Sequence, residues 1–252
     1  MEKAEPELDD GKVKRLMRRK KRTLVFDGLK IEAPAVVAVL SGPAAERDAS
    51  AAEGHGSDLV EVRLDLVPGD PIGAIRKVRE ATVLPIIATN RIAEEGGAFR
   101  GGEDERIEIL AEASAWADLV DVEFLAGGRD RLMEMVDRPL IISYHDFEGM
   151  PTLEATRSIL AEIFGCGADI AKMALTPSTL KDCLGLLQIV HETERPLSLM
   201  GMGDLGKHLR AVAPVYGSVL TYGYVGTATA PGQIPVEALR EVLDVLMRSN
   251  GL

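Results

Sequence analysis

Val60-Glu61-Val62-Arg63-Leu64-Asp65 alternates apolar and charged residues without a break. A period of two is typical of a β-strand whose two faces meet different surroundings. Seven further segments are apolar or alternating in the same way, and stretches with helical spacing separate them. The eight strand candidates are residues 36–40, 59–64, 85–89, 119–124, 140–145, 170–174, 197–202 and 218–222.

Strands that alternate with helices indicate parallel βαβ units, and 252 residues is the length of a typical (β/α)₈ barrel. We therefore predict an α/β protein, a (β/α)₈ TIM barrel that forms a single domain over residues 23–252. A β-hairpin over residues 23–31, with Asp27-Gly28 as its turn, is expected to cap the bottom of the barrel. A final helix is expected over residues 236–247. An antiparallel sheet is the alternative, but its strands usually join through short turns.

The N-terminal segment differs in composition from the rest of the chain. An acidic run over residues 2–10 precedes a basic cluster over residues 12–22. We predict that residues 1–22 form a flexible, charged extension outside the core. Such a cluster can contact nucleic acid or an anionic membrane. The whole chain has a formal net charge of -11, which argues against a general nucleic-acid binder, and we predict neither partner.

The two cysteines, Cys166 and Cys183, are too few and too far apart for a zinc or iron-sulfur site. We expect them to be reduced thiols. The sequence also contains neither a secretory signal pattern nor an apolar window long enough to span a bilayer. These features predict a cytoplasmic protein.

Alternation also indicates which residues point into the barrel. The outward face of each strand meets a helix, whereas the inward face near the carboxyl end opens on the active site. Glu61, Arg63 and Asp65 should therefore point inward. The same rule applied to the other strands directs these residues inward: Thr89, Arg91, Asp121, Glu123, Ser143, His145, Ile170, Lys172, Ser198, Met200 and Met202. For Asp65 and Asp121, a structural ion pair is an equal alternative to a role in chemistry.

Lys172 and His145 are the sharpest candidates for chemistry. A lysine between Ala171 and Met173 would be desolvated, which favours the neutral amine that can attack a carbonyl to form a Schiff base. A lysine at this place can also bind an anionic substrate or pair with an acid. His145 is the one histidine of four at the carboxyl end of a strand candidate.

A glycine-rich segment, Gly201-Met202-Gly203-Asp204-Leu205-Gly206, has the spacing of a dinucleotide-binding loop. The acidic residue expected about 20 positions later is absent. We therefore predict no dinucleotide cofactor and expect these glycines to allow close approach to a ligand.

Several motifs, in order along the chain, carry a family resemblance. They are Glu61-Val62-Arg63, Arg91 with Glu95-Gly96-Gly97, Asp121-Val122-Glu123-Phe124, Ile141-Ile142-Ser143-Tyr144-His145-Asp146, Lys172-Met173-Ala174, Met200 with Met202, Arg210, and Thr229-Ala230-Pro231-Gly232-Gln233-Ile234. Over residues 23–247 the chain resembles the type I 3-dehydroquinate dehydratases. That resemblance implies a (β/α)₈ barrel of the shikimate pathway, usually a homodimer, that converts 3-dehydroquinate to 3-dehydroshikimate without a metal or an organic cofactor.

The resemblance also implies a role for each matched residue. Lys172 corresponds to the imine-forming lysine and His145 to the general acid and base, with Glu95, or less closely Glu94, orienting the histidine. The matched substrate-binding residues are Glu61, Arg63 and Arg91 for the ring hydroxyls, Arg210 for the carboxylate, Met200 and Met202 for an apolar wall, and Thr229 and Gln233 for a closing loop. The family often has Ser at the position of Thr229.

Two other functions share some of these features. A class I aldolase would use the same Schiff-base lysine on a similar barrel. A non-catalytic small-molecule binder would not require Lys172. Arg210 and the Ala230-Pro231-Gly232-Gln233 segment favour the dehydratase.

Overall fold

The computed structural model of the protein describes residues 22–26 and 28–247. The predicted N-terminal extension therefore lies outside the described residues, except for Arg22, which the structure places in the first strand. The start of the hairpin is thus one residue earlier than predicted.

Within the described part of the chain, eight parallel strands form one sheet in the order β10-β3-β4-β5-β6-β7-β8-β9. The backbone NH of Val219 donates to Leu197 O at 2.8 Å, and Ser198 Oγ donates to Leu220 O at 3.0 Å, which brings β9 beside β10 and nearly closes the barrel. The strands are β3 (Ala35–Leu40), β4 (Leu59–Arg63), β5 (Ile86–Thr89), β6 (Leu119–Glu123), β7 (Leu140–Asp146), β8 (Ile170–Leu175), β9 (Leu197–Gly201) and β10 (Leu220–Tyr224). The predicted TIM barrel is confirmed.

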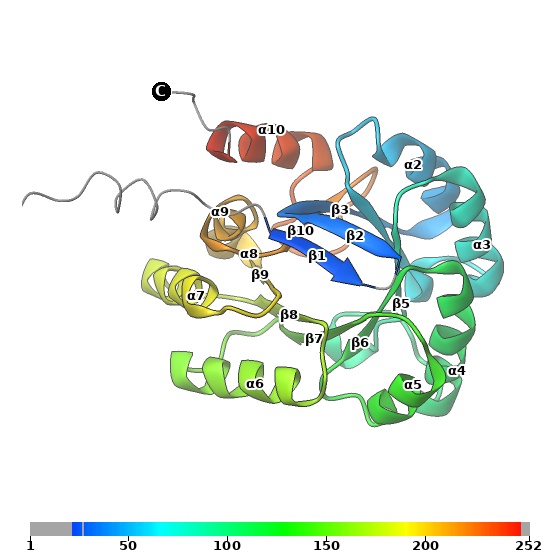
Figure 1. Ribbon diagram of the computed structural model, residues 1–252, viewed down its shortest axis with the longest axis horizontal. Helices are drawn as coiled ribbons and strands as arrows, with labels where there is room; N and C mark the ends of the chain where they lie inside the picture. Colours follow the sequence, from blue (N-terminus) through cyan, green and yellow to red (C-terminus); the bar gives the residue numbers. More distant parts are fainter. Residues whose placement is uncertain (1–21, 27, 248–252) are drawn as a thin grey trace, which may run out of the picture.

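Helices connect successive strands and surround the sheet (Figure 1). They are α2 (Ala45–Ala52), α3 (Pro71–Ala81), α4 (Glu103–Ala113), α5 (Arg129–Met135), α6 (Leu153–Gly165), α7 (Leu180–Glu192), α8 (Gly203–Gly206), α9 (Leu209–Tyr216) and α10 (Val236–Met247). The last of these has the predicted bounds. Short 3₁₀ turns are η1 (Gly42–Ala44), η2 (Leu64–Leu66), η3 (Ala93–Glu95) and η4 (Ser114–Trp116). Among the described residues, every helix is too short or too polar to cross a bilayer.

The alternation of β4 separates two buried layers. Val60 and Val62 are fully buried in the apolar cluster between the strands and the helices. Glu61 and Arg63, also buried, point into the barrel, where they line a pocket. The predicted inward and outward faces of this strand are thus confirmed.

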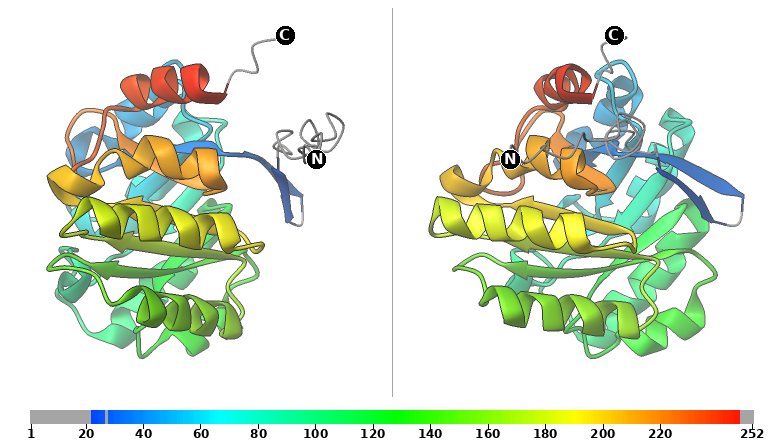
Figure 2. Two further views of the ribbon diagram at one scale, coloured as in Figure 1. Left: turned by 90° about the vertical axis from the view of Figure 1, so that its left-hand side faces the viewer. Right: turned by 60° about the vertical axis from the view of Figure 1, so that its left-hand side comes forward.

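The hairpin of β1 (Arg22–Phe26) and β2 (Leu29–Ala33) closes one end of the barrel. Its Leu24 and Ile31 are buried in one cluster with inward-facing residues at the amino ends of the barrel strands, such as Ile141 and Ile170. Figure 2 shows the hairpin at the opposite end of the molecule from the loop between β10 and α10. The hairpin is the predicted bottom cap, so the other end is left for the active site.

The last strand is the one whose predicted bounds differ most. The ladder with β3 runs over Leu220–Tyr224, two residues later than predicted. Gly223 pairs with Ala38, and Tyr224 pairs with Val39. Neither Gly223 nor Tyr224 continues the apolar pattern from which the strands were predicted.

Candidate active site

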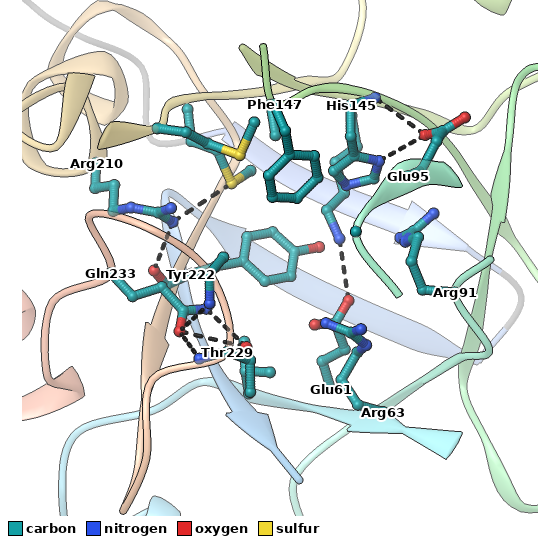
Figure 3. Close-up of a pocket in the computed structure, with 17 residues that line it drawn as sticks. Glu61, Arg63, Arg91, Glu95, His145, Phe147, Arg210, Tyr222, Thr229 and Gln233 are labelled. Carbon is teal, nitrogen blue, oxygen red and sulfur yellow. Dashed lines mark hydrogen bonds and ion pairs between the residues drawn. The ribbon is translucent and has the colours of Figure 1, made fainter. Parts of the chain in front are cut away.

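The carboxyl ends of the strands surround a pocket (Figure 3). Every residue predicted for the site lines this pocket. They are Glu61 and Arg63 on β4, Arg91 after β5, Glu95 on η3, His145 on β7, Lys172 on β8, Met200 and Met202 at the end of β9, Arg210 on α9, and Thr229 and Gln233 in the loop before α10.

Lys172 lies at the floor of the pocket between two carboxylates. Its Nζ donates to Glu61 Oε1 at 3.0 Å and to Asp121 Oδ2 at 2.8 Å, and the lysine side chain is 5% exposed. The side chain is buried, as expected from the sequence, but it lies between two carboxylates rather than in apolar surroundings alone. Lys172 is therefore one member of a buried cluster of oppositely charged side chains.

Asp121 joins Lys172 to Arg91. Arg91 Nη2 donates to Asp121 Oδ1 at 2.6 Å, and Arg91 Nη1 donates to Ser143 Oγ at 2.7 Å. Burial alone would raise the pKa of Asp121, but the charges of Arg91 and Lys172 outweigh it and hold that pKa well below its usual range. Asp121 is therefore a lasting negative charge beside the lysine, which is the ion-pair alternative, and a role in chemistry stays a prediction.

Asp65 has a structural role. Its carboxylate accepts two hydrogen bonds from Arg63, at 2.9 and 2.6 Å, and one from the backbone NH of Ala98 at 3.0 Å. Burial favours the neutral acid, but Arg63 outweighs it and lowers the pKa of Asp65. The ion pair fixes the Arg63 guanidinium at the pocket wall.

His145 and Glu95 form a second buried pair. Glu95 Oε2 lies 2.8 Å from His145 Nδ1 and accepts from the His145 backbone NH at 3.1 Å. Desolvation, opposed by the charge of Arg91, raises the pKa of Glu95 to about 7. Desolvation, together with the positive charges of Arg91 and Lys172, lowers the pKa of His145 well below its ordinary value. The imidazole is therefore neutral at pH 7, and Nε2 is left to act on a ligand.

Two glycines explain why the turn at Glu95 takes this shape. Gly96 has a φ of 75°, and a Cβ there would lie 2.2 Å from the ring of Phe147, which stacks on His145. A Cβ on Gly97 would lie 2.0 Å from Arg91 O. Glu94 is exposed, whereas Glu95 is buried against His145. Of the two glutamates considered from the sequence, Glu95 is therefore the one that contacts the histidine.

Arg210 occupies the other side of the pocket. Its guanidinium donates to Gly232 O at 2.9 Å and to Tyr222 O at 3.2 Å, both neutral acceptors. Burial lowers the pKa of Arg210 to about 10. A buried cation bonded to carbonyl groups is well suited to an incoming carboxylate, which a guanidinium fork binds through two parallel hydrogen bonds.

Thr229 and Gln233 are bonded to each other in the loop over the pocket. Gln233 Oε1 accepts from the backbone NH of Thr229 at 2.6 Å, and Gln233 Nε2 donates to Thr229 Oγ1 at 3.2 Å. Gly226 and Gly232, at φ values of 79° and 72°, mark the two ends of this turn. The Thr229 hydroxyl thus takes part in holding the loop closed on itself.

Two aromatic pocket residues were missed by the sequence analysis, as was the apolar Val39. Phe147 and Tyr222 both line the pocket, and Tyr222 is 2% exposed. The alternation of the last strand, which puts Leu220 and Tyr222 on the inner face, could have found the tyrosine. Phe147 comes after its strand and has no periodic signal.

The glycine-rich segment has a different explanation from the one predicted. A Cβ on Gly201 would lie 2.5 Å from Gly206 O, and one on Gly206 would lie 2.7 Å from Gly201 C. The close approach is between two backbone segments at the start of α8, not between backbone and ligand. This packing accounts for Gly201 and Gly206, and a ligand contact at this segment stays a prediction.

Comparison with known proteins shows the family of this chain. Residues 36–250 match the family model described as Type I 3-dehydroquinase. The chain is 50% identical over 225 residues to a 3-dehydroquinate dehydratase of Methanothrix thermoacetophila, covering 89% of this chain and 97% of that protein. It is 42% identical over 211 residues to one from Methanocella arvoryzae, covering 82% and 96%.

Solved structures show the same architecture. The 3-dehydroquinate dehydratase of Geobacillus kaustophilus HTA426 superposes with a TM-score of 0.82 at 30% identity, covering 89% of this chain and 96% of that one. A dihydropteroate synthase from Yersinia pestis, at 12% identity and a TM-score of 0.61 over 90% and 98% of the two chains, shares the fold alone. With a family match over nearly the whole chain and the matched residues gathered in one pocket, this protein belongs to the type I 3-dehydroquinase family.

Proposed function

We propose that Lys172 is the imine-forming residue of this type I 3-dehydroquinase, which eliminates water from 3-dehydroquinate to give 3-dehydroshikimate through a lysine Schiff base. The observation that carries the proposal is the position of Lys172 Nζ. It lies between Glu61 and Asp121, in the pocket that the His145–Glu95 pair also lines.

Imine formation begins with loss of a proton from the Lys172 ammonium. Arg91 holds Asp121 as a carboxylate of low pKa, so Glu61 Oε1, at 3.0 Å from Nζ, is the better acceptor. The amine then adds to the substrate ketone to give a carbinolamine. The carbinolamine oxygen takes up a proton and leaves as water, and the C=N⁺ bond forms.

The iminium withdraws electrons from the neighbouring carbon, which makes its C–H bond acidic enough for a neutral imidazole to break. His145 Nε2 takes this proton, because Nδ1 is held by Glu95. The imidazolium then gives a proton to the departing hydroxyl, the C–O bond breaks and the double bond forms. Hydrolysis of the product imine returns the lysine.

The remaining side chains orient the ring. Arg210 binds the substrate carboxylate, while Glu61, Arg63 and Arg91 hold the ring hydroxyls. Met200 and Met202, both nearly fully buried, form the apolar wall. Thr229 and Gln233 close the pocket from the loop.

Reduction with borohydride tests the roles of Lys172 and His145. Borohydride added with 3-dehydroquinate should trap an adduct on the peptide that contains Lys172, and Lys172→Ala should abolish it. His145→Ala should still form the imine, because the amine is retained, but turnover should fall by about 10²- to 10⁴-fold. Mass spectrometry of the trapped protein locates the adduct.

The same experiment separates the other functions. An adduct on another lysine, or full turnover by Lys172→Ala, contradicts the mechanism. Adduct formation with acyclic sugar phosphates and none with 3-dehydroquinate would favour the aldolase. Tight binding of 3-dehydroquinate without conversion would favour the simple binder.

We also propose that the enzyme works in the cytoplasm as a homodimer that takes the small molecule 3-dehydroquinate as its partner. The family resemblance is the basis for the dimer. The free thiols of Cys166 and Cys183 support a reducing compartment. Sedimentation velocity at micromolar concentration tests the dimer, since a single monomeric species would contradict it.

A further inference from the structure

Tyr222 places a phenol hydroxyl inside the pocket that the mechanism above does not use. The residue lies on β10, on the inner face of the barrel, and is 2% exposed. Figure 3 shows its ring extending into the pocket between Arg210 and Glu61. A phenylalanine would fill the same apolar space without introducing a polar atom.

The hydroxyl makes no hydrogen bond with the residues that the structure describes. Buried hydroxyl groups are normally paired, and one left unpaired disfavours the folded state. Burial, reinforced by the charges of Glu61 and Asp121, raises the pKa of Tyr222 well above its ordinary value. The group is therefore a neutral hydrogen-bond donor at pH 7.

Its position relative to Lys172 limits what it can reach. Lys172 Nζ lies 4.2 Å from the centre of the Tyr222 ring. A substrate carbon bonded to Nζ therefore lies close to this ring, on the side chain whose hydroxyl has no partner in the described structure.

We infer that the Tyr222 hydroxyl is a specificity-determining donor, which gives a hydrogen bond to a substrate oxygen at or next to the carbonyl carbon attacked by Lys172. This inference rests on the proposed function, because it takes a hydroxylated cyclic ketone as the ligand. The substrate supplies the partner that the folded protein lacks. Tyr222 thus favours rings with oxygen at this position over analogues without it.

Tyr222→Phe tests this inference, because it removes the hydroxyl and keeps the ring. With 3-dehydroquinate, kcat/KM should fall about 2- to 13-fold, the range that corresponds to one hydrogen bond of about 0.5–1.5 kcal/mol. The Tm of the ligand-free variant should equal or exceed that of the wild type, because the lost hydroxyl was buried without a partner. The rise in Tm caused by saturating 3-dehydroshikimate should be smaller in the variant.

Tyr144→Phe is the matched control. Tyr144 is half-buried among the side chains that pack under the helices and is not a pocket residue. Its loss of a hydroxyl should leave kcat/KM and the ligand-induced rise in Tm unchanged.

The possible outcomes are distinguishable. Wild-type kcat/KM in Tyr222→Phe, or a lower ligand-free Tm with the full ligand-induced rise, overturns the inference and gives the hydroxyl a structural role or none. Absence of turnover in the wild type and in Tyr144→Phe would instead contradict the proposed function itself.

Discussion

Replacement of Glu95 by glutamine should stabilise the protein in a way that depends on pH. The pKa of Glu95 is about 7 in the folded protein, against an ordinary value of 4.5. Between these two values the folded protein keeps a proton that the unfolded chain has lost, so the free energy of unfolding falls as the pH rises. Glutamine has the shape of the protonated acid and carries no such penalty.

The magnitude follows from the same two values. Their separation corresponds to about 3 kcal/mol, fully present above pH 7 and absent below pH 4.5. The Glu95 side chain is 7% exposed, so solvent screening reduces this figure little. His145 has the opposite effect on the free energy of unfolding. Because its pKa is lowered in the folded protein, this free energy falls as the pH falls. His145 is present in both proteins, so its contribution cancels to first order in the difference between Glu95→Gln and the wild type.

Urea unfolding at pH 5, 6, 7 and 8, followed by the fluorescence of Trp116, measures this difference. We expect the advantage of Glu95→Gln to grow by about 2–3 kcal/mol between pH 5 and pH 8. The neighbouring variant Glu94→Gln is the control, because Glu94 lies at the surface. Its difference from the wild type should not grow over this range.

A constant difference for Glu95→Gln across the four pH values would refute the reasoning. It would mean that Glu95 is ionised throughout and that His145 carries the proton of the pair. The growth with pH is the quantity tested, because other effects of the amide, such as the loss of the buried Oε1, do not depend on pH.

Three further predictions concern the lid, the carboxylate anchor and metals. Hydrogen exchange over residues 226–235 should slow when 3-dehydroshikimate binds, and equal rates with and without ligand would contradict the assignment of a closing loop. Arg210→Lys should raise KM by about 10- to 100-fold, because an ammonium lacks the planar fork, and steady-state kinetics with an unchanged KM would remove Arg210 from carboxylate binding. Activity should survive prolonged EDTA treatment and desalting, since residues 22–26 and 28–247 contain no group of three side chains suited to hold a metal. If activity is lost on this treatment and one divalent cation restores it, the enzyme requires a metal and the prediction is contradicted.

The barrel was predictable because its signal is repeated. Each strand, such as β4, has an apolar outer face that must pack on helices, so eight separate segments carry the same information. The end of β10 was less predictable because Gly223 and Tyr224 are held by backbone pairing with β3, which requires no particular side chain. A ladder of this kind leaves little trace in the sequence.

Strand alternation and motif matches predicted which residues belong to the site. They did not predict which other side chains form hydrogen bonds and ion pairs with these residues. Arg106 is an example, since it comes from helix α4 and yet is fully buried, with Nη1 donating to Glu123 Oε2 at 2.6 Å. Its helical spacing gives no sign that the side chain reaches the end of β6. The single hydroxyl of Tyr222 was missed for a related reason, because a buried aromatic residue is ordinarily part of a core.

The position of Lys172 between Glu61 and Asp121 has a consequence for the whole catalytic cycle. An ammonium and a protonated imine carry the same single positive charge, so the resting enzyme and its iminium intermediate place the same charge between these carboxylates. The two carboxylates can therefore stabilise the resting enzyme and its covalent intermediate without rearranging. A lysine transplanted alone into another barrel would lack these two carboxylates, and neither its ammonium nor its iminium would have a counter-charge beside it.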